Sequence, residues 1–153
     1  MTLKELLIKH EGKRYKPYRC TAGKWTIGIG HNIDAKGLPD DIQAYLTEYG
    51  QITDDMVDIL YKADVCEAIA DCLRLYPAFD SFSKPRKKAL IDFLFNVGLP
   101  TAKQFKKTNR AINEGRWQDA TEGLRDSKWY HQVKGRADEI IEMIIGGRYA
   151  NMD

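Results

Sequence analysis

The chain has 153 residues, 43% of them hydrophobic and 30% charged, which is ordinary for a globular protein. Its 24 Lys and Arg residues against 22 Asp and Glu residues give a net charge of +2, too small to indicate a nucleic-acid-binding protein by itself. No apolar run approaches the ~20 residues of a membrane span, and the charges near the N-terminus argue against a signal peptide.

A short helix is predicted at the start of the chain. Thr2 and Glu5 have the spacing of a capping box, and the apolar residues that follow recur at helical intervals. Gly12 is a typical helix-ending residue, so the helix is predicted at 3–11, with Glu11 in its last turn.

Alternating apolar and small residues predict strands across 15–33. If the hairpin turn is centred near Gly23, Cys20 and Thr26 are cross-strand neighbours. The glycines two and four residues after Thr26 fall on the same face of the strand, where the missing side chains leave room for another group.

The rest of the chain is predicted to be helical. A short helix is expected at 38–49, and a pattern of about 22 residues before Pro77 predicts a helix roughly 33 Å long joining two lobes. Shorter helices are predicted at 83–98, 101–113, 117–125 and 135–145. These elements predict an α+β fold, with a small lobe carrying the sheet and a larger helical lobe.

The cysteines do not predict a disulfide framework, because three is an odd number and no secretory signal is visible. Cys66 and Cys72 are six residues apart in one helical pattern and are expected on different helix faces. We interpret both as small core residues.

Glu11, Cys20 and Thr26 form the most informative combination of residues. A carboxylate at a helix C-terminus faces the negative end of the helix dipole, which favours the protonated form that a general acid requires. Thr26 and Cys20 on the hairpin could position a water molecule, as in an inverting glycosidase. The alternative interpretation is a solvated glutamate at a helix end.

The segment "HEGKRYKPYRCTAGKWTIGIGHNI", residues 10–33, resembles the signature of the phage-type lysozymes or endolysins of glycoside hydrolase family 24. That signature is Glu, eight residues, Asp or Cys, five residues and Thr, which here are Glu11, Cys20 and Thr26. Three later segments continue the resemblance in the same order over nearly the whole chain: "ALIDFLFNVG", "GRWQDA" and "SKWYHQVKGRADEI".

The resemblance implies a single lysozyme-like α+β domain over 1–153. Its parts would be a sheet-containing lobe at 13–53, a connecting helix at 54–76 and a helical lobe at 77–153. The helix at 3–11 is expected to pack with the helical lobe, and the glycan to lie in the cleft between the lobes.

The same resemblance implies hydrolysis of the β-1,4 bond between N-acetylmuramic acid and N-acetylglucosamine in bacterial peptidoglycan, by an inverting mechanism without a cofactor or metal. We expect a monomeric endolysin that stays in the host bacterial cytoplasm until a separate holin-type pore releases it to the cell wall, causing lysis. Neither nucleic-acid binding nor stable membrane insertion is expected.

Further site residues follow from matching positions. The resemblance makes Glu11 the general acid, with Thr26 and Cys20 as the water-positioning groups. Arg136 is expected to pair with Glu11, and His31 to form a structural ion pair with Asp64. The expected cleft-lining residues are Gly30, Asn32, Phe95, Asn96, Thr108 and Gln132, with Phe95 equally compatible with a core position. The aromatics expected to pack the helical lobe are Trp117, Trp129 and Tyr130.

Several alternatives stay open at this point. Cys20 could be a base, a nucleophile or a bystander, because family members also carry Asp here, and His31 could serve it in a thiol hydrolase. A lytic transglycosylase would need only Glu11 and would release 1,6-anhydro products. A non-enzymatic binding module for glycan or nucleic acid is the third hypothesis. The basic clusters at 84–88 and 103–107 are interpreted first as solvated helix faces and second as sites of attraction to anionic wall polymers.

Overall fold

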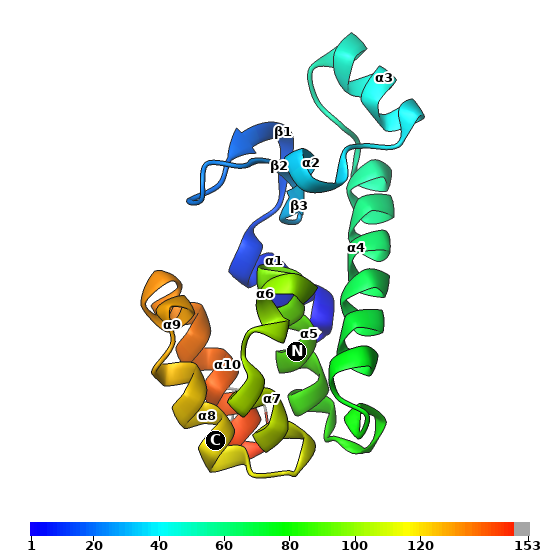
Figure 1. Ribbon diagram of the computed structural model, residues 1–153. Helices are drawn as coiled ribbons and strands as arrows, with labels where there is room; N and C mark the ends of the chain where they lie inside the picture. The colour runs from blue at the N-terminus through cyan, green and yellow to red at the C-terminus, as the bar shows by residue number, and fades with distance from the viewer. Residues whose placement is uncertain (149–153) are drawn as a thin grey trace. The chain divides into compact units, whose positions relative to one another are not determined.

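A computed structural model describes residues 1–148 (Figure 1). The chain divides into two compact units, one formed by Thr2–Cys66 and the other by Met1 with the chain from Glu67 onward. Within the described residues, no helix is both long enough and apolar enough to cross a lipid bilayer. Many helices and one small antiparallel sheet confirm the predicted α+β class.

The first unit contains the sheet. Its elements are α1 (Leu3–Glu11), β1 (Arg14–Arg19), β2 (Trp25–Gly28), β3 (His31–Asn32), α2 (Ile33–Lys36), α3 (Asp40–Tyr49) and the part of α4 (Asp54–Leu75) up to Cys66. The capping box of α1 is confirmed, because the Thr2 hydroxyl accepts from the Glu5 amide at 3.1 Å and the Glu5 carboxylate accepts from the Thr2 amide at 3.0 Å. Because α1 belongs to this unit, its packing against the helical lobe stays a prediction.

The sheet has the order β1-β2-β3 and is antiparallel throughout. The expected cross-strand pairing of Cys20 with Thr26 is wrong, because Tyr18 is the residue opposite Thr26. The Cys20 amide instead donates to the Lys24 carbonyl at 2.9 Å, so the turn is centred one residue earlier than Gly23. A shift of one residue in the turn centre moves the partner of Thr26 by two residues and keeps the strand faces unchanged.

The second unit is helical. Its elements are the 3-10 turn η1 (Phe79–Ser81), α5 (Lys84–Val97), α6 (Leu99–Lys103), α7 (Lys106–Asn113), α8 (Trp117–Arg125), α9 (Lys128–Gln132) and α10 (Lys134–Gly146). Helix α10 packs against α5, α8 and α9, and α7 packs against α8. The single helix predicted at 101–113 is two helices, because the chain turns at Gln104 and Phe105 and the Phe105 ring packs edge-on against Phe93 at 5.3 Å.

The cysteine predictions are confirmed in part. All three thiols are free, and Cys72 is fully buried, as expected for a core residue. Cys66 is exposed, so its assignment to the core is wrong. Residues six apart on a helix point about 240° apart around the axis, and only one of the two faces the interior.

Arg86 joins two helix ends within the second unit. Its Nε donates to the Ile144 carbonyl at 2.7 Å, and its guanidinium lies 4.2 Å from the centre of the Trp117 ring. The carbonyls of the last turn of a helix lack intrahelical donors, and Arg86 supplies donors to them in α10. One member of the basic cluster at 84–88 therefore has a structural role instead of lying on a solvated face.

We predict that Arg86→Ala lowers the free energy of unfolding by about 2 kcal/mol, because it removes a charged donor from the α10 carbonyls. Lys84→Ala, at an exposed position of the same helix, should change it by less than about 0.5 kcal/mol. Urea denaturation of the two variants provides the measurement. Equal losses in both would contradict the assigned capping role.

Candidate functional site

The Glu11 carboxylate lies directly against the backbone of Gly30. Glu11 is the last residue of α1, and Gly12 ends the helix with φ +77° and an amide that donates to the Ile8 carbonyl at 2.8 Å. A Cβ atom placed on Gly30 would lie 2.6 Å from Glu11 Cδ and 2.7 Å from Oε2. The space that the strand glycines were predicted to leave is therefore occupied by the side chain proposed to do the chemistry.

Thr26 and Cys20 lie on the hairpin that begins two residues after α1. The Thr26 side chain is only 4% exposed, and its hydroxyl donates to the Lys24 carbonyl at 2.9 Å. This bond fixes the rotamer of Thr26 and leaves lone pairs on its oxygen for another donor. Cys20 is half-buried just beyond the end of β1.

The surroundings of the Cys20 thiol lower its pKa. Burial raises its pKa, but hydrogen bonds to the sulfur, led by those from the backbone amides of Lys24 and Ala22, lower it more, so the net pKa lies below the ordinary value of 9.0. Hydrogen bonds to sulfur favour the thiolate, which is the form that accepts a proton. In contrast, burial raises the pKa of Cys72 strongly, so that thiol stays protonated.

Tyr18 is a site residue that the sequence reasoning missed. It lies opposite Thr26 in the sheet, and its pKa is raised by burial and by the negative charges of Glu11 and Cys20. The charges of both of these groups therefore act on the Tyr18 hydroxyl. The only available signal was its position two residues before Cys20, on the same strand face.

The predicted pair of His31 and Asp64 is present, with Nδ1 2.8 Å from a carboxylate oxygen and both side chains at most 6% exposed. The other ring nitrogen, Nε2, lies 2.7 Å from the Gly37 carbonyl, and Lys36 contacts the second carboxylate oxygen at 3.0 Å. Burial lowers the pKa of His31, but Asp64 and the Gly37 carbonyl raise it by a larger amount, so the net pKa is above 6.5. Since both ring nitrogens face acceptors, the geometry supports the structural interpretation over the thiol hydrolase.

Asn32 has a local structural partner. Its side-chain oxygen accepts from the Ala35 amide at 3.0 Å and caps α2. An asparagine at a helix start is held in one orientation by this bond, which leaves its amide nitrogen as the group available to a ligand. Its expected place on the substrate stays a prediction.

The remaining predicted cleft residues belong to the second unit. Asn96 is half-buried and accepts from Trp129 Nε1 at 2.8 Å, which fixes its amide plane. Phe95 is half-buried beside it, and Gln132 is exposed at the end of α9. Thr108 is 5% exposed and packs so closely on α8 that a Cβ on Gly123 would collide with its hydroxyl. This packing accounts for Thr108 without a substrate, and its contact with glycan stays a prediction.

The aromatic residues of this unit follow the predicted packing to different degrees. Trp129 is buried and packs edge-on against Phe93 at 4.9 Å. Trp117 is half-buried against Phe82, with ring centres 4.9 Å apart. Tyr130 is half-buried, and its hydroxyl donates to Asp138 at 2.7 Å, so it joins the polar edge of the unit.

Arg136 forms an ion pair with Asp92, a second residue that the sequence reasoning missed. Its Nε donates to the Asp92 carboxylate at 2.8 Å, and the two side chains are 8% and 0% exposed. The signal for Asp92 was a single carboxylate inside the apolar run "ALIDFLF". Because Arg136 and Glu11 belong to different units, their pairing stays a prediction.

Within residues 1–148, no three His, Cys, Asp or Glu side chains are grouped so that they could hold a metal ion. The candidate site offers a carboxyl group on Glu11, a thiol of lowered pKa on Cys20 and an oriented hydroxyl on Thr26. This set can donate a proton, accept a proton and hold a water molecule.

Comparisons with known proteins place these residues in a family context. The sequence profile of the phage lysozyme family matches residues 8–142. The chain is 30% identical to the pre-baseplate central spike protein Gp5 of Enterobacteria phage T4 over 96% of its own length, and it spans 28% of that protein. It is 27% identical to a probable T4-type lysozyme of Dictyostelium discoideum over 95% of each chain. It is also 25% identical to the peptidoglycan hydrolase gp36 of Pseudomonas phage phiKMV, over 89% of this chain and 14% of that protein.

We predict that Gly30→Ala lowers the rate of the catalysed reaction by about 10²-fold, because the new methyl group would push the Glu11 carboxylate out of place. The positive φ of +63° at Gly30 should also cost about 1 kcal/mol of stability. Rates and urea denaturation measured on the same preparation separate the two effects.

Gly50→Ala is the matched control. Gly50 has a similar φ of +73°, but a Cβ there would meet no atom within 4 Å. Gly50→Ala should therefore lower the free energy of unfolding by a similar amount and leave the rate of the catalysed reaction unchanged. Equal rate losses in both variants would show that backbone strain, and not contact with Glu11, causes the effect.

We predict that His31→Asn lowers the free energy of unfolding by about 3 kcal/mol at about pH 5.5, because it leaves Asp64 buried without the histidine. The raised pKa of His31 gives stabilisation that is complete below 6.5 and is lost as pH rises through the folded-state pKa. The difference in the free energy of unfolding between the native protein and His31→Asn should therefore become smaller at alkaline pH. His131→Asn, at an exposed position, is the control. A loss of unfolding free energy in His31→Asn that does not change with pH would refute the stabilisation by the charged histidine.

Proposed function

Because the chain belongs to the phage lysozyme family, we propose that it hydrolyses the β-1,4 bond between N-acetylmuramic acid and N-acetylglucosamine in bacterial peptidoglycan. The relatives named as lysozymes and as peptidoglycan hydrolases support this substrate. The observation that carries the proposal is the close approach of the Glu11 carboxylate to Gly30, which connects β2 to β3. The hairpin of the same sheet carries Thr26 and Cys20.

In this proposal Glu11 is the general acid. It donates its proton to the glycosidic oxygen as the bond to the anomeric carbon breaks. A water molecule held by the Thr26 hydroxyl attacks that carbon from the opposite side, and its proton passes to the Cys20 thiolate. The lowered pKa of Cys20 supports the thiolate form, and attack by water from the opposite side gives inversion.

The proposed glycan contacts come from both units. Gly30 and Asn32 serve the sugars near Glu11, with the Asn32 amide nitrogen as donor. Asn96 is oriented by Trp129 to bind hydroxyl or N-acetyl groups, with Phe95 against an apolar sugar face. Thr108 and Gln132 complete the proposed set, and Arg136 is the proposed partner of Glu11.

The biological role that we propose is that of a monomeric endolysin. It would act on the cell wall after leaving the host cytoplasm through a separate holin-type pore. The phage origin of several relatives supports this role, including an endolysin from a phage of an Acyrthosiphon pisum endosymbiont that is 40% identical over 28% of this chain.

We predict that Glu11→Gln lowers the rate on purified peptidoglycan by at least ~10²-fold, because the amide cannot donate the required proton. The exposed Glu48→Gln is the control and should retain full activity. Mass spectrometry of the products is the measurement, with reducing-end muramic acid expected. Anhydro-muramic ends would indicate a lytic transglycosylase, and absence of cleavage by the unmodified protein would indicate a binding module.

The role of Cys20 is tested by its own variants in the same assay. Cys20→Asp should remain active and extend activity to lower pH, because a carboxylate with a pKa of about 3.9 stays ionised where a thiol is protonated. Cys20→Ala should be slower than the unmodified protein. Equal rates for Cys20→Ala and the unmodified protein would show that Cys20 is a bystander.

A further inference from the structure

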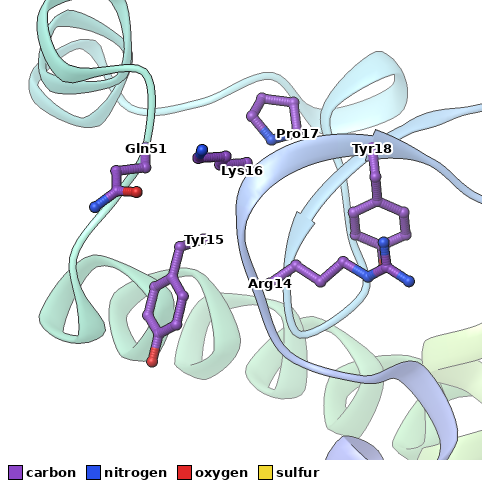
Figure 2. A pocket seen from close by; sticks show the side chains of 6 residues that line it. All are labelled: Arg14, Tyr15, Lys16, Pro17, Tyr18 and Gln51. Atoms are coloured by element: carbon purple, nitrogen blue, oxygen red, sulfur yellow. The ribbon is translucent and has the colours of Figure 1, made fainter.

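A surface pocket is formed mainly by residues of β1, and the function proposed above does not use it. It has a volume of about 370 Å³. Figure 2 shows the side chains that line it. We call it the β1 pocket, and the residues that line it are Arg14, Tyr15, Lys16, Pro17, Tyr18 and Gln51. All six belong to the first unit.

An irregularity in β1 shapes the pocket. The register jumps from Arg14 opposite Gly28 to Tyr18 opposite Thr26, so β1 carries two more residues than β2 over this stretch. Pro17 lies inside the jump and has no amide to donate to the ladder. Bulges of this kind redirect side chains and are frequent beside active sites.

Contacts with Ile52, in the segment before α4, and with Asp54, the first residue of α4, hold the bulge in place. The Ile52 amide donates to the Tyr15 carbonyl at 2.9 Å, which brings the neighbouring Gln51 to the rim of the pocket. The Tyr15 hydroxyl donates to the Asp54 carboxylate at 2.6 Å, and Lys13 contacts the same oxygen at 2.9 Å. The backbone around the pocket is therefore fixed before any ligand arrives, which lowers the entropy lost on binding.

The pocket presents positive charge that no carboxylate neutralises within residues 1–148. The guanidinium of Arg14 lies 4.4 Å from the centre of the Tyr18 ring, which holds it in position. Lys16 is exposed, and its side chain lies on the Gln51 side of the pocket (Figure 2). Lys13, by contrast, is paired with Asp54. Two cations and the Gln51 amide supply many donors, and this is the chemistry that recognises carboxylates.

Tyr18 places the pocket next to the candidate catalytic groups. One side of this residue lines the pocket, and its backbone lies opposite Thr26 in the sheet. A ligand of the pocket would therefore be attached to the substrate close to the bond that is cleaved. Peptidoglycan carries such groups, since each muramic acid bears a lactyl-linked peptide with free carboxylates.

We propose that the β1 pocket binds the carboxylates of the peptide that the substrate carries on muramic acid. This inference rests on the proposed hydrolysis of peptidoglycan and adds a specificity site to it. Arg14 and Lys16 pair with the carboxylates, and the rings of Tyr15 and Tyr18 cover the apolar parts of the peptide.

The test compares two forms of one substrate. Peptidoglycan is first freed of phosphate polymers with hydrogen fluoride, and half of it is then converted to neutral amides with carbodiimide and excess methylamine. The unmodified protein should show a kcat/KM roughly tenfold lower on the amidated form. The double variant Arg14→Gln with Lys16→Gln should cleave both forms at the lower value, through a raised KM and an unchanged kcat.

The control double variant is Lys62→Gln with Arg74→Gln, which removes the same two charge types from exposed positions of α4. It should behave as the unmodified protein. A loss in the control equal to that of the pocket variant would show general charge attraction and overturn the inference. The inference would also be overturned if the pocket variant lost kcat/KM by the same factor on both forms of peptidoglycan, or lost none on either form. Failure of the unmodified protein to cleave either form would refute the proposed function itself.

Discussion

The contact between the Glu11 carboxylate and Gly30 is the constraint on which the candidate site depends. A carboxyl carbon can approach the backbone this closely only where the opposing residue has no Cβ. The end of α1 at Gly12 and the tight connection between β2 and β3 at Gly30 both serve this approach. The helix end and the sheet are thereby joined at the atom group that is proposed to transfer a proton.

Each unit also has its own buried ion pair. His31 with Asp64 joins the sheet to α4 in the first unit, and Arg136 with Asp92 joins α10 to α5 in the second. Buried charges are costly to remove from water unless they are paired and hydrogen-bonded, so such pairs fix which elements meet. Cys20 differs from these pairs, because backbone amides stabilise its charged form without a cation.

Local signals predicted much of the fold. The capping box, the helix that ends at Glu11 and the helix of 54–75 were predictable because caps, glycines and prolines act over a few residues. The partner of Thr26 was not predictable, because a shift of one residue in the turn centre changes it. Helices α2 and α9 were not predictable either, because each is a single turn and shows no periodicity in the sequence. The roles of Tyr18 and Asp92 depend on residues distant in sequence. Cys66 was misassigned because helical spacing alone does not say which face is buried.

The bulge in β1 has a second consequence, which concerns solubility. β1 is an edge strand, and an edge strand exposes unpaired amides and carbonyls to which a strand from another molecule can add. Pro17 removes one of those donors, the bulge breaks the regular spacing of the others, and Lys16 puts a charge on the edge. The segment that shapes the β1 pocket therefore also protects the molecule against edge-to-edge aggregation.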